Sequence, residues 1–396
     1  MTRVGPTTDS WPLFEIVVSQ PSVHVHRIHL SISLFLVDGM TEQILRSEVA
    51  DIASMTSNPT SNRNNPLPEL GLTFRDYSTS VQNIRAHPTF ESSLQYWRNR
   101  IPTLPTAPSV PTRVSPNVGV LGVQHYGGRL SALKWRSILA AQQDAMPGVG
   151  LTPTSLLLTV YAETLSRWSN QSHFLINVMH TLRHPVHRDV GRLVGNFSST
   201  ILLEVLLDQA HQGNFAKHAT TVSGQLFEDL SHGTVSGVDV MQMMNSTRTG
   251  AAFTAVAPFA FTSTIGLTAK DEKEDEKETA ATKATTTTCE QVYSLVQTPQ
   301  TWLDHQVEVE VSTGDLIYNF DFLSELFPKD VVEGIVQTYG AILESLSSRT
   351  SWHAPIYTLL PSPRPAAPVT PADDVSALPR LLHDPFWRSV AETPDA

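Results

Sequence analysis

Alternating hydrophobic and polar residues predict the first ordered element of the chain. Within Val23–Val37, aliphatic residues alternate with histidine and serine. A period of two places the apolar side chains on one face, which is typical of a strand. Over Asp38–Ile52 the period becomes helical, with Ile44, Leu45 and Val49 on one face. A strand followed directly by a helix is therefore expected at this place.

A second series of elements is predicted further along the chain. Thr152 and Pro153 form a favourable pair of N-cap and first-turn residues, so a helix is expected over Pro153–Trp168. Its apolar residues recur at helical spacing, at Leu157, Val160, Tyr161, Leu165 and Trp168. Strands are expected at Phe174–Met179, Thr200–Val205 and Gly314–Phe322, and a helix at Val331–Ser347.

These elements do not alternate regularly, and the sequence has no repeat and no phosphate-binding glycine-rich loop. The predicted fold class is therefore α+β (mixed α/β). Two proline-rich stretches divide the chain, since Ile101–Asn117 has five prolines and Pro355–Pro371 has six. Such stretches are usually extended connectors. We expect a front lobe over residues 10–100, a linker at 101–117, a body at 118–350 and a tail at 351–396.

A run of charged residues interrupts the body. Lys270–Glu278 reads KDEKEDEKE and carries a net charge of -3. Such a segment has no apolar surface to bury, so residues 270–290 are interpreted as a charged loop inserted into the body. An acidic interaction tail is the less favoured interpretation.

Composition excludes several classes of protein. With 27 Lys+Arg against 38 Asp+Glu, the net charge of -11 argues against a protein that binds the nucleic-acid backbone. The single cysteine, Cys289, excludes an internal disulfide and a multi-cysteine zinc site. The sequence shows neither a secretory signal nor an apolar stretch long enough to span a bilayer. We therefore expect a cytoplasmic protein that does not act at a membrane.

Histidines provide the only candidate metal ligands. His24, His26 and His29 fall on one predicted strand, and His184 and His187 are three positions apart. No carboxylate or cysteine completes a recognisable ligand spacing. No metal site is therefore expected.

The late part of the body contains several short motifs in a fixed order. Tyr293–Phe327 resembles a signature of heterocyclization domains, which are condensation-domain relatives in nonribosomal peptide synthetases. The matching motifs are Gln297-Thr298-Pro299-Gln300, Leu303-Asp304-His305-Gln306, Asn319-Phe320-Asp321 and Leu326-Phe327-Pro328. Other collinear blocks lie at Trp11–Phe14, Leu72–Tyr77, Tyr96–Arg98, Leu193–Ser199, Val235–Val240 and Ala257–Ser263.

The resemblance covers roughly residues 10 to 350 and implies a chloramphenicol-acetyltransferase-like fold of two lobes. Compared with the family, the opening segment of the front lobe is missing, so we expect an incomplete front lobe. The tail resembles the lead-in to an adenylation domain. A fragment of a larger synthetase is therefore one interpretation of the sequence.

The resemblance also implies a reaction and its site residues. Heterocyclization forms an amide, attacks its carbonyl with a Cys, Ser or Thr side chain, and removes water to give a thiazoline or oxazoline. A partly buried carboxylate suits the dehydration, because burial raises its pKa toward neutrality. The resemblance assigns that role to Asp304 and places Thr262 beside it, 42 positions away. Substrate-cleft candidates are Gln297, Gln300, Ser263 and Asn196.

Each catalytic assignment has a structural alternative. Asp304 would otherwise be a surface acid at the edge of a helix, and Thr262 would be a strand residue chosen for its β-propensity. No cofactor is expected to bind directly, because substrates in this family arrive on the phosphopantetheine arms of carrier domains. No carrier-domain serine motif is found, so carrier proteins are expected as partners in trans.

One motif departs from the family pattern. Where heterocyclization domains have DxxxxDxxS, this chain has Ser33, Asp38 and Thr41. Leu34 occupies the place of the catalytic histidine of amide-forming condensation domains. The resemblance implies that Asp38 is structural and forms an ion pair with Arg183.

Two functions of different classes are thus open. The first is an enzyme that joins carrier-bound acyl and aminoacyl thioesters and closes the heterocycle. The second is a catalytically impaired condensation-type protein, either a carrier-docking module or the remnant of a synthetase. Ser33 and the missing front segment favour the second.

Overall fold

The computed structural model describes residues 11–23, 25–57, 67, 69–113, 122–207, 213–246, 255–266, 293–298, 300–310 and 312–359. The chain forms two compact units, each assembled from segments that are distant in sequence. The first unit comprises Met1–His87, Thr181–Ser199 and Gly266–Glu290, and the second comprises Pro88–His180, Thr200–Ile265 and Gln291–Ala396. Residues 267–292, with the charged run and Cys289, and residues 360–396 lie outside the described residues.

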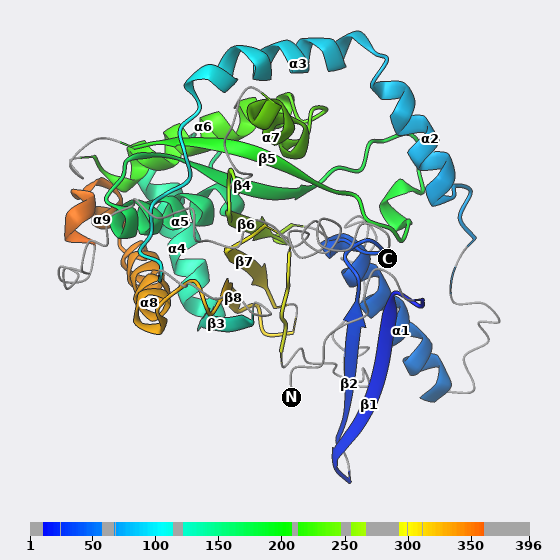
Figure 1. Cartoon of the computed structure of the whole chain (residues 1–396). Helices are drawn as coiled ribbons and strands as arrows, with labels where there is room; N and C mark the ends of the chain where they lie inside the picture. The colour runs from blue at the N-terminus through cyan, green and yellow to red at the C-terminus, as the bar shows by residue number, and fades with distance from the viewer. Residues whose placement is uncertain are drawn as a thin grey trace, which may run out of the picture. The chain divides into compact units, whose positions relative to one another are not determined.

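The first unit contains an antiparallel hairpin of β1 (Phe14–Ser22) and β2 (Val25–Ile32) (Figure 1). The strand expected at Val23–Val37 is confirmed as β2, but it ends at Ile32, where a turn begins. The helix expected next is α1 (Gly39–Ser57). Also in this unit are α2 (Phe74–Ile84), which Thr73 and Asp76 cap reciprocally, and the short helix η2 (Val190–Arg192).

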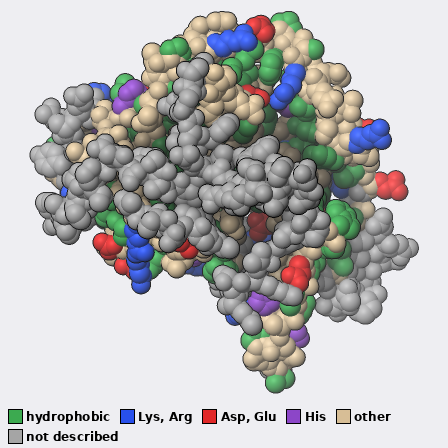
Figure 2. Space-filling model, in the orientation of Figure 1, with side chains coloured by type: hydrophobic (Ala, Val, Ile, Leu, Met, Phe, Trp, Pro, Cys, Tyr) green, Lys and Arg blue, Asp and Glu red, His purple; other side chains and the backbone are tan. Residues whose placement is uncertain are grey.

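The hairpin carries its apolar side chains on one face. Cross-strand register pairs Phe14 with Ile32, Ile16 with Leu30 and Val18 with Ile28. Strand alternation places these six side chains together. Five of them are exposed, Phe14, Ile16, Val18, Ile28 and Leu30. Figure 2 shows hydrophobic side chains at the surface of this hairpin.

The second unit is built on a six-stranded sheet in the order β3-β8-β7-β6-β4-β5. The strands are β3 (Val123–Leu130), β4 (His173–Thr181), β5 (Ser198–Leu206), β6 (Phe259–Ser263), β7 (Leu303–Val309) and β8 (Leu316–Leu323). β6 pairs in parallel with β4 and β7, and β8 pairs antiparallel with β7 and β3. The predicted strands β4, β5 and β8 and the mixed α/β class are thereby confirmed.

Helices surround this sheet (Figure 1). They are α3 (Pro88–Arg100), α4 (Ala132–Ala145), α5 (Pro153–Ser169), α6 (Phe215–Ser231), α7 (Gly237–Ser246), α8 (Lys329–Ser345) and α9 (Arg349–His353). Short turns of 3₁₀ helix lie at η1 (Ile101–Thr103) and η6 (Ile356–Thr358). The helices expected at Pro153–Trp168 and Val331–Ser347 are confirmed as α5 and α8.

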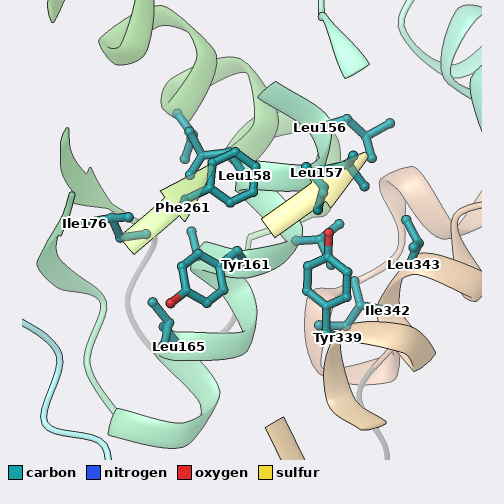
Figure 3. Packing of buried hydrophobic residues seen from close by; sticks show 14 of the residues in the cluster. Leu156, Leu157, Leu158, Tyr161, Leu165, Ile176, Phe261, Tyr339, Ile342 and Leu343 are labelled. Carbon is teal, nitrogen blue, oxygen red and sulfur yellow. The ribbon is translucent and has the colours of Figure 1, made fainter. Parts of the chain in front are cut away.

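Helix α5 is the centre of the larger core. The Thr152 hydroxyl accepts a hydrogen bond from the backbone N–H of Ser155, which caps the helix as the sequence indicated. Every residue from Ser155 to Ser166 is buried, so the helix is enclosed on all sides. Figure 3 shows Tyr161 and Leu165 of α5 in one cluster with Tyr339 of α8 and Phe261 of β6. This packing fixes the strands on which the site is built.

The sheet has faces of opposite character at β6, β7 and β8. On one face Phe261, His305 and Phe320 pack with Tyr161 and Tyr339. Since side chains alternate along a strand, the neighbouring residues lie on the opposite face. That face carries Thr262, Asp304, Gln306 and Asp321, with His125 from β3 in register with Asp321. Its polar side chains form the candidate site.

Candidate active site

Thr262 and Asp304 lie on adjacent parallel strands. In the β6–β7 register Ala260 is opposite Asp304, and Thr262 is opposite Gln306. The Thr262 hydroxyl donates to Asp304 Oδ1 at 3.5 Å, the long limit of a hydrogen bond. The fold therefore brings together the two residues that the resemblance assigned to catalysis. Asp304 is on a strand with 6% of its surface exposed, so the alternative of a surface acid at a helix edge is wrong.

Burial raises the pKa of Asp304 to about 6. The nearby charge of Asp321 acts in the same direction, whereas hydrogen bonds from Gln306 and Thr262 lower the pKa. A carboxyl group with a pKa near 6 is present in both protonation states close to neutral pH. It can therefore donate and accept a proton within one reaction cycle.

Gln306 links Asp304 to a second carboxylate. Its Nε2 donates to Asp304 Oδ2 at 3.1 Å and to Asp321 Oδ2 at 3.2 Å. Asp321 also accepts from the backbone N–H of Val296 at 2.8 Å and lies 2.7 Å from Nδ1 of His125. In the sequence, Gln306 and Asp321 stand in the family motifs without an assigned role, and no motif includes His125. Strand alternation, which puts Asp304 and Gln306 on one face, was the available signal.

His305 follows Asp304 but serves the hydrophobic core. Its ring stacks on Phe320 with centroids 4.1 Å apart, and its Nδ1 lies 2.9 Å from the carbonyl oxygen of Asn319. Burial lowers the pKa of His305 to about 3, so the ring is neutral at physiological pH. It is fully buried on the face opposite Asp304, which makes it unsuitable as the proton-transfer group of this site.

The substrate-cleft candidates of this unit occupy different surroundings. Ser263 lies on the helix-covered face, where its hydroxyl is 2.9 Å from that of Thr154 at the start of α5. Gln297 and Gln300 are both exposed in the segment before β7, and Gln300 has a positive φ of 64°. Pro299 of that motif lies outside the described residues. None of the three shares the hydrogen bonds described for Asp304.

Asp38, Thr41 and Arg183 form a buried cluster in the first unit. Arg183 Nη2 donates to Asp38 Oδ1 at 3.1 Å and to the Thr41 hydroxyl at 3.1 Å. The ion pair predicted for Asp38 and Arg183 is therefore confirmed, and its side chains are almost fully buried.

The same cluster anchors three backbone segments. Asp38 caps α1 by accepting from the backbone N–H of Thr41 at 2.7 Å. Thr41 donates to the carbonyl oxygen of Gly195 at 2.7 Å. Arg183 donates through Nη1 to the carbonyl oxygens of Val190 and Leu193. These hydrogen bonds join α1 to Thr181–Ser199, so the cluster has a structural role.

Ser33 and Asn196 lie near each other in the first unit. Asn196 Nδ2 donates to the carbonyl oxygen of Leu34 at 2.7 Å, and its Oδ1 accepts from the backbone N–H of Ser198. The Ser33 hydroxyl accepts a long hydrogen bond from the backbone N–H of Phe35. Both side chains therefore hold the turn after β2.

Within the described residues, no group of three or more His, Cys, Asp and Glu side chains is arranged to hold a metal ion. His29 instead pairs with Ser19 at 2.8 Å, and His187 lies 3.6 Å from Asp189. His24 is outside the described residues.

Of the helices that the structure describes, none has the length and apolarity to cross a bilayer.

Comparisons with known proteins agree with this architecture. The chain is 30% identical over 353 residues to pyochelin synthetase PchF of Pseudomonas aeruginosa, an alignment covering 87% of this chain and 18% of PchF. It is 29% identical over 394 residues to phenyloxazoline synthase MbtB of Mycolicibacterium paratuberculosis, covering 97% of this chain and 31% of MbtB. The chain thus spans less than a third of the length of either relative.

A solved structure supports the same grouping. The EpoB NRPS cyclization-docking bidomain from Sorangium cellulosum matches with a TM-score of 0.69 at 26% identity. The match covers 86% of this chain and 64% of the EpoB chain. The fold is thus of the class found in nonribosomal peptide synthetases. The Condensation domain family matches residues 8–364, and the chain belongs to that family.

Proposed function

We propose that this chain catalyses condensation followed by heterocyclization. It would join a carrier-bound acyl thioester to a carrier-bound cysteinyl, seryl or threonyl thioester, and then close a thiazoline or oxazoline ring. The observation that carries the proposal is the contact of Thr262 with the buried Asp304, in which burial raises the pKa of the carboxyl group to about 6. The names of relatives support it, since MbtB is a phenyloxazoline synthase and the EpoB structure is of a cyclization domain.

Asp304 would act in the loss of water. After the side-chain thiol or hydroxyl adds to the amide carbonyl, the ring carbon carries a hydroxyl group and the ring nitrogen a hydrogen. Protonated Asp304 gives its proton to the hydroxyl group, which leaves as water. The resulting carboxylate takes the proton of the ring nitrogen as the C=N bond forms, which regenerates the acid. Thr262, which donates to Asp304 Oδ1, would orient the carboxyl group.

The partners follow from this chemistry. Acyl and aminoacyl groups would be delivered on phosphopantetheine arms by carrier proteins acting in trans, in the cytoplasm. No cofactor bound by the chain itself is required. An adenylation domain or a larger synthetase would load the carriers. Asp38 and Arg183 would serve structure rather than chemistry, because both are occupied by buried hydrogen bonds.

A non-catalytic docking module is the second candidate. The observation in its favour is Ser33, which holds a backbone turn where the family pattern has an aspartate. Under this alternative, carriers would bind but Asp304 would have no reaction to perform.

Mass spectrometry of a reconstituted reaction tests both functions. The purified chain is mixed with acyl-loaded and cysteinyl-loaded carriers, and the products are compared with Asp304→Asn. We expect the amide lacking one water with the native chain. With Asp304→Asn we expect ring formation to fall about 100-fold or more while the open amide accumulates. Asp330→Asn, on an exposed position of α8, is the matched control.

Two results would contradict the proposal. A folded native chain that gives no product would support the docking module instead. Ring formation unchanged in Asp304→Asn would remove Asp304 from the mechanism, and the site would have to be sought elsewhere.

A further inference from the structure

Four polar side chains from three strands form a continuous chain of hydrogen bonds on the polar face of the sheet. From the β6 side, Thr262 donates to Asp304, and Gln306 donates to both Asp304 and Asp321. Beyond them, His125 of β3 lies 2.7 Å from Asp321. Strand register enforces this order, because Asp321 is opposite Asp304 on one side and opposite His125 on the other.

Asp321 is held on both of its oxygens. Oδ1 faces the His125 ring, and Oδ2 accepts from the Val296 backbone N–H and the Gln306 amide. Its side chain is 2% exposed, whereas that of His125 is 22% exposed. These contacts fix the position of the Asp321 carboxyl group beside Asp304. The charge of Asp321 raises the pKa of Asp304.

Gln306 has no freedom to turn its amide around. Both carboxylate oxygens that it contacts are acceptors, so the NH₂ group must face them. One amide thus holds the two carboxylates in a set geometry. The charge of Asp321 favours the protonated form of Asp304, whereas the hydrogen bond from Gln306 favours the ionised form.

We propose that Asp321, held by His125 and coupled to Asp304 through Gln306, is a positioning residue that keeps Asp304 ready to protonate the leaving hydroxyl group. This role of Asp321 rests on the proposed cyclodehydration. The effect of Asp321 on the titration of Asp304 can nevertheless be measured without substrate. Asp321 makes no contact with the Thr262 hydroxyl and acts only through Asp304 and Gln306.

Other titratable groups lie on the same strands and on the elements packed against them. They are His305 and Glu308 on β7, Tyr161 on α5, His125 on β3, and Tyr293, whose ring lies beside His125. Tyr161 is buried, and burial and the charge of Asp304 raise its pKa, so it is neutral. His305 is neutral for the reason given above. Asp321, paired with His125, is the charged group that acts on the pKa of Asp304, so its replacement changes the charge next to Asp304.

Two substitutions separate the opposing effects. Asp321→Asn keeps the shape and lets the amide oxygen accept from Val296 and Gln306, while the amide nitrogen faces His125. It removes the charge and reverses the contact with His125, because the amide nitrogen donates where the carboxylate oxygen accepted. Gln306→Met keeps the length of the side chain and removes the donor to both carboxylates. The first change should favour ionisation of Asp304, and the second should oppose it.

NMR titration of the full-length chain, carrying ¹³C in its aspartate carboxyl groups, provides the test. The resonance absent from Asp304→Asn identifies Asp304, and its midpoint is expected near pH 6. We expect the midpoint to fall by roughly half a pH unit or more in Asp321→Asn and to rise by a similar amount in Gln306→Met. Asp330→Asn should leave it unchanged, and thermal unfolding checks that each variant is folded.

The outcomes distinguish this inference from the proposed function. If the native chain forms the ring but neither variant moves the midpoint, Asp321 is only structural and the inference is overturned. If the midpoints move in opposite directions but no ring is formed, the coupling stands and the proposed function fails. Where both hold, the pH above which ring formation declines should move with the midpoint, downward in Asp321→Asn and upward in Gln306→Met.

Discussion

A buried carboxylate such as Asp304 reduces the stability of the protein that carries it. The sequence alone left Asp304 open to two interpretations, because a motif letter does not reveal burial. The structure decides between them through the register of β6 and β7, which sets Thr262 and Asp304 on one face. Gln306 and Asp321 have their roles for the same reason, since their partners come from other strands. Contacts between residues that are distant in the sequence could not be predicted, because they depend on the fold.

Replacing Asp304 should stabilise the protein at neutral pH. Burial raises its pKa from 3.8 to about 6, so folding favours the protonated form. That contribution is fully present below pH 3.8 and is lost as the pH rises through about 6. At about pH 7.5, Asp304→Asn should therefore raise the free energy of unfolding by up to about 3 kcal/mol, with little effect at about pH 4.

Urea unfolding at the two pH values measures the difference. Asp330→Asn, which replaces an exposed carboxylate, should show no comparable pH dependence. An equal effect of Asp304→Asn at both pH values would mean that the carboxyl group is not buried in solution.

Arg183 illustrates a second kind of buried charge. Arg183→Met should destabilise the chain by about 3–5 kcal/mol, because Asp38 would remain buried without its counter-charge. The control is Arg188→Met, since the Arg188 side chain is 88% exposed. Chemical denaturation compares the two variants. A loss below about 1 kcal/mol in Arg183→Met would show that water replaces the ion pair at little cost.

At the scale of elements, periodicity predicted the helices and strands whose apolar residues are regularly spaced along one face. The α5 and α8 helices and the β2, β4, β5 and β8 strands follow from apolar spacing and from the Thr152 cap. Strand β1 was missed because Ile16, Val17 and Val18 are consecutive apolar residues without alternation. Ser263 was expected to line the substrate cleft. Strand alternation, however, places its side chain on the face opposite Thr262.

Close packing between α5 and α8 gives a prediction about one glycine. A Cβ on Gly334 of α8 would lie 2.3 Å from the Trp168 ring of α5. That ring is also held by a 3.1 Å hydrogen bond from its Nε1 to Thr338. Gly334→Ala should therefore destabilise the chain by about 1–3 kcal/mol, despite the better helix propensity of alanine.

Gly224 of α6 is the matched control. Apart from the neighbouring backbone of α6 itself, no atom of the described residues lies within 4 Å of a Cβ added there. Gly224→Ala should stabilise the chain by about 0.5–1 kcal/mol, because only the helix propensity changes. Thermal unfolding of both variants separates packing from propensity. Equal stabilisation by both would mean that α5 and α8 do not approach each other this closely.

At the scale of the whole molecule, the sequence placed boundaries at prolines, whereas the compact units are discontinuous. Thr181–Ser199 belongs with residues 1–87, because Arg183 binds Asp38 and Thr41. Helix α3 belongs with the second unit, where Trp97 is fully buried against Leu175 and Ile201. Proline content reports where the backbone is extended, but long-range contacts determine which segments pack together. Because the compact units are assembled from discontinuous segments, they do not test linear boundaries. The boundaries expected at residues 100 and 118 stay predictions.

The exposed apolar face of the β1–β2 hairpin gives a prediction about self-association of the whole molecule in solution. Ile16, Val18 and Ile28 are each more than half exposed and lie together on that face. Contiguous apolar surface of this kind promotes association. We expect the chain to associate reversibly as its concentration rises, and Ile16→Lys with Ile28→Lys to shift it toward the monomer. The lysines cost little stability, because their positions are exposed.

Sedimentation velocity over a range of concentrations measures this shift. Leu133→Lys is the control, since Leu133 is 79% exposed on α4 and belongs to neither hairpin strand. It should leave the concentration dependence as in the native chain. If both variants reduce association equally, general charge repulsion would explain the effect and the hairpin would have no special part. If neither does, the apolar face is tolerated in water without a partner.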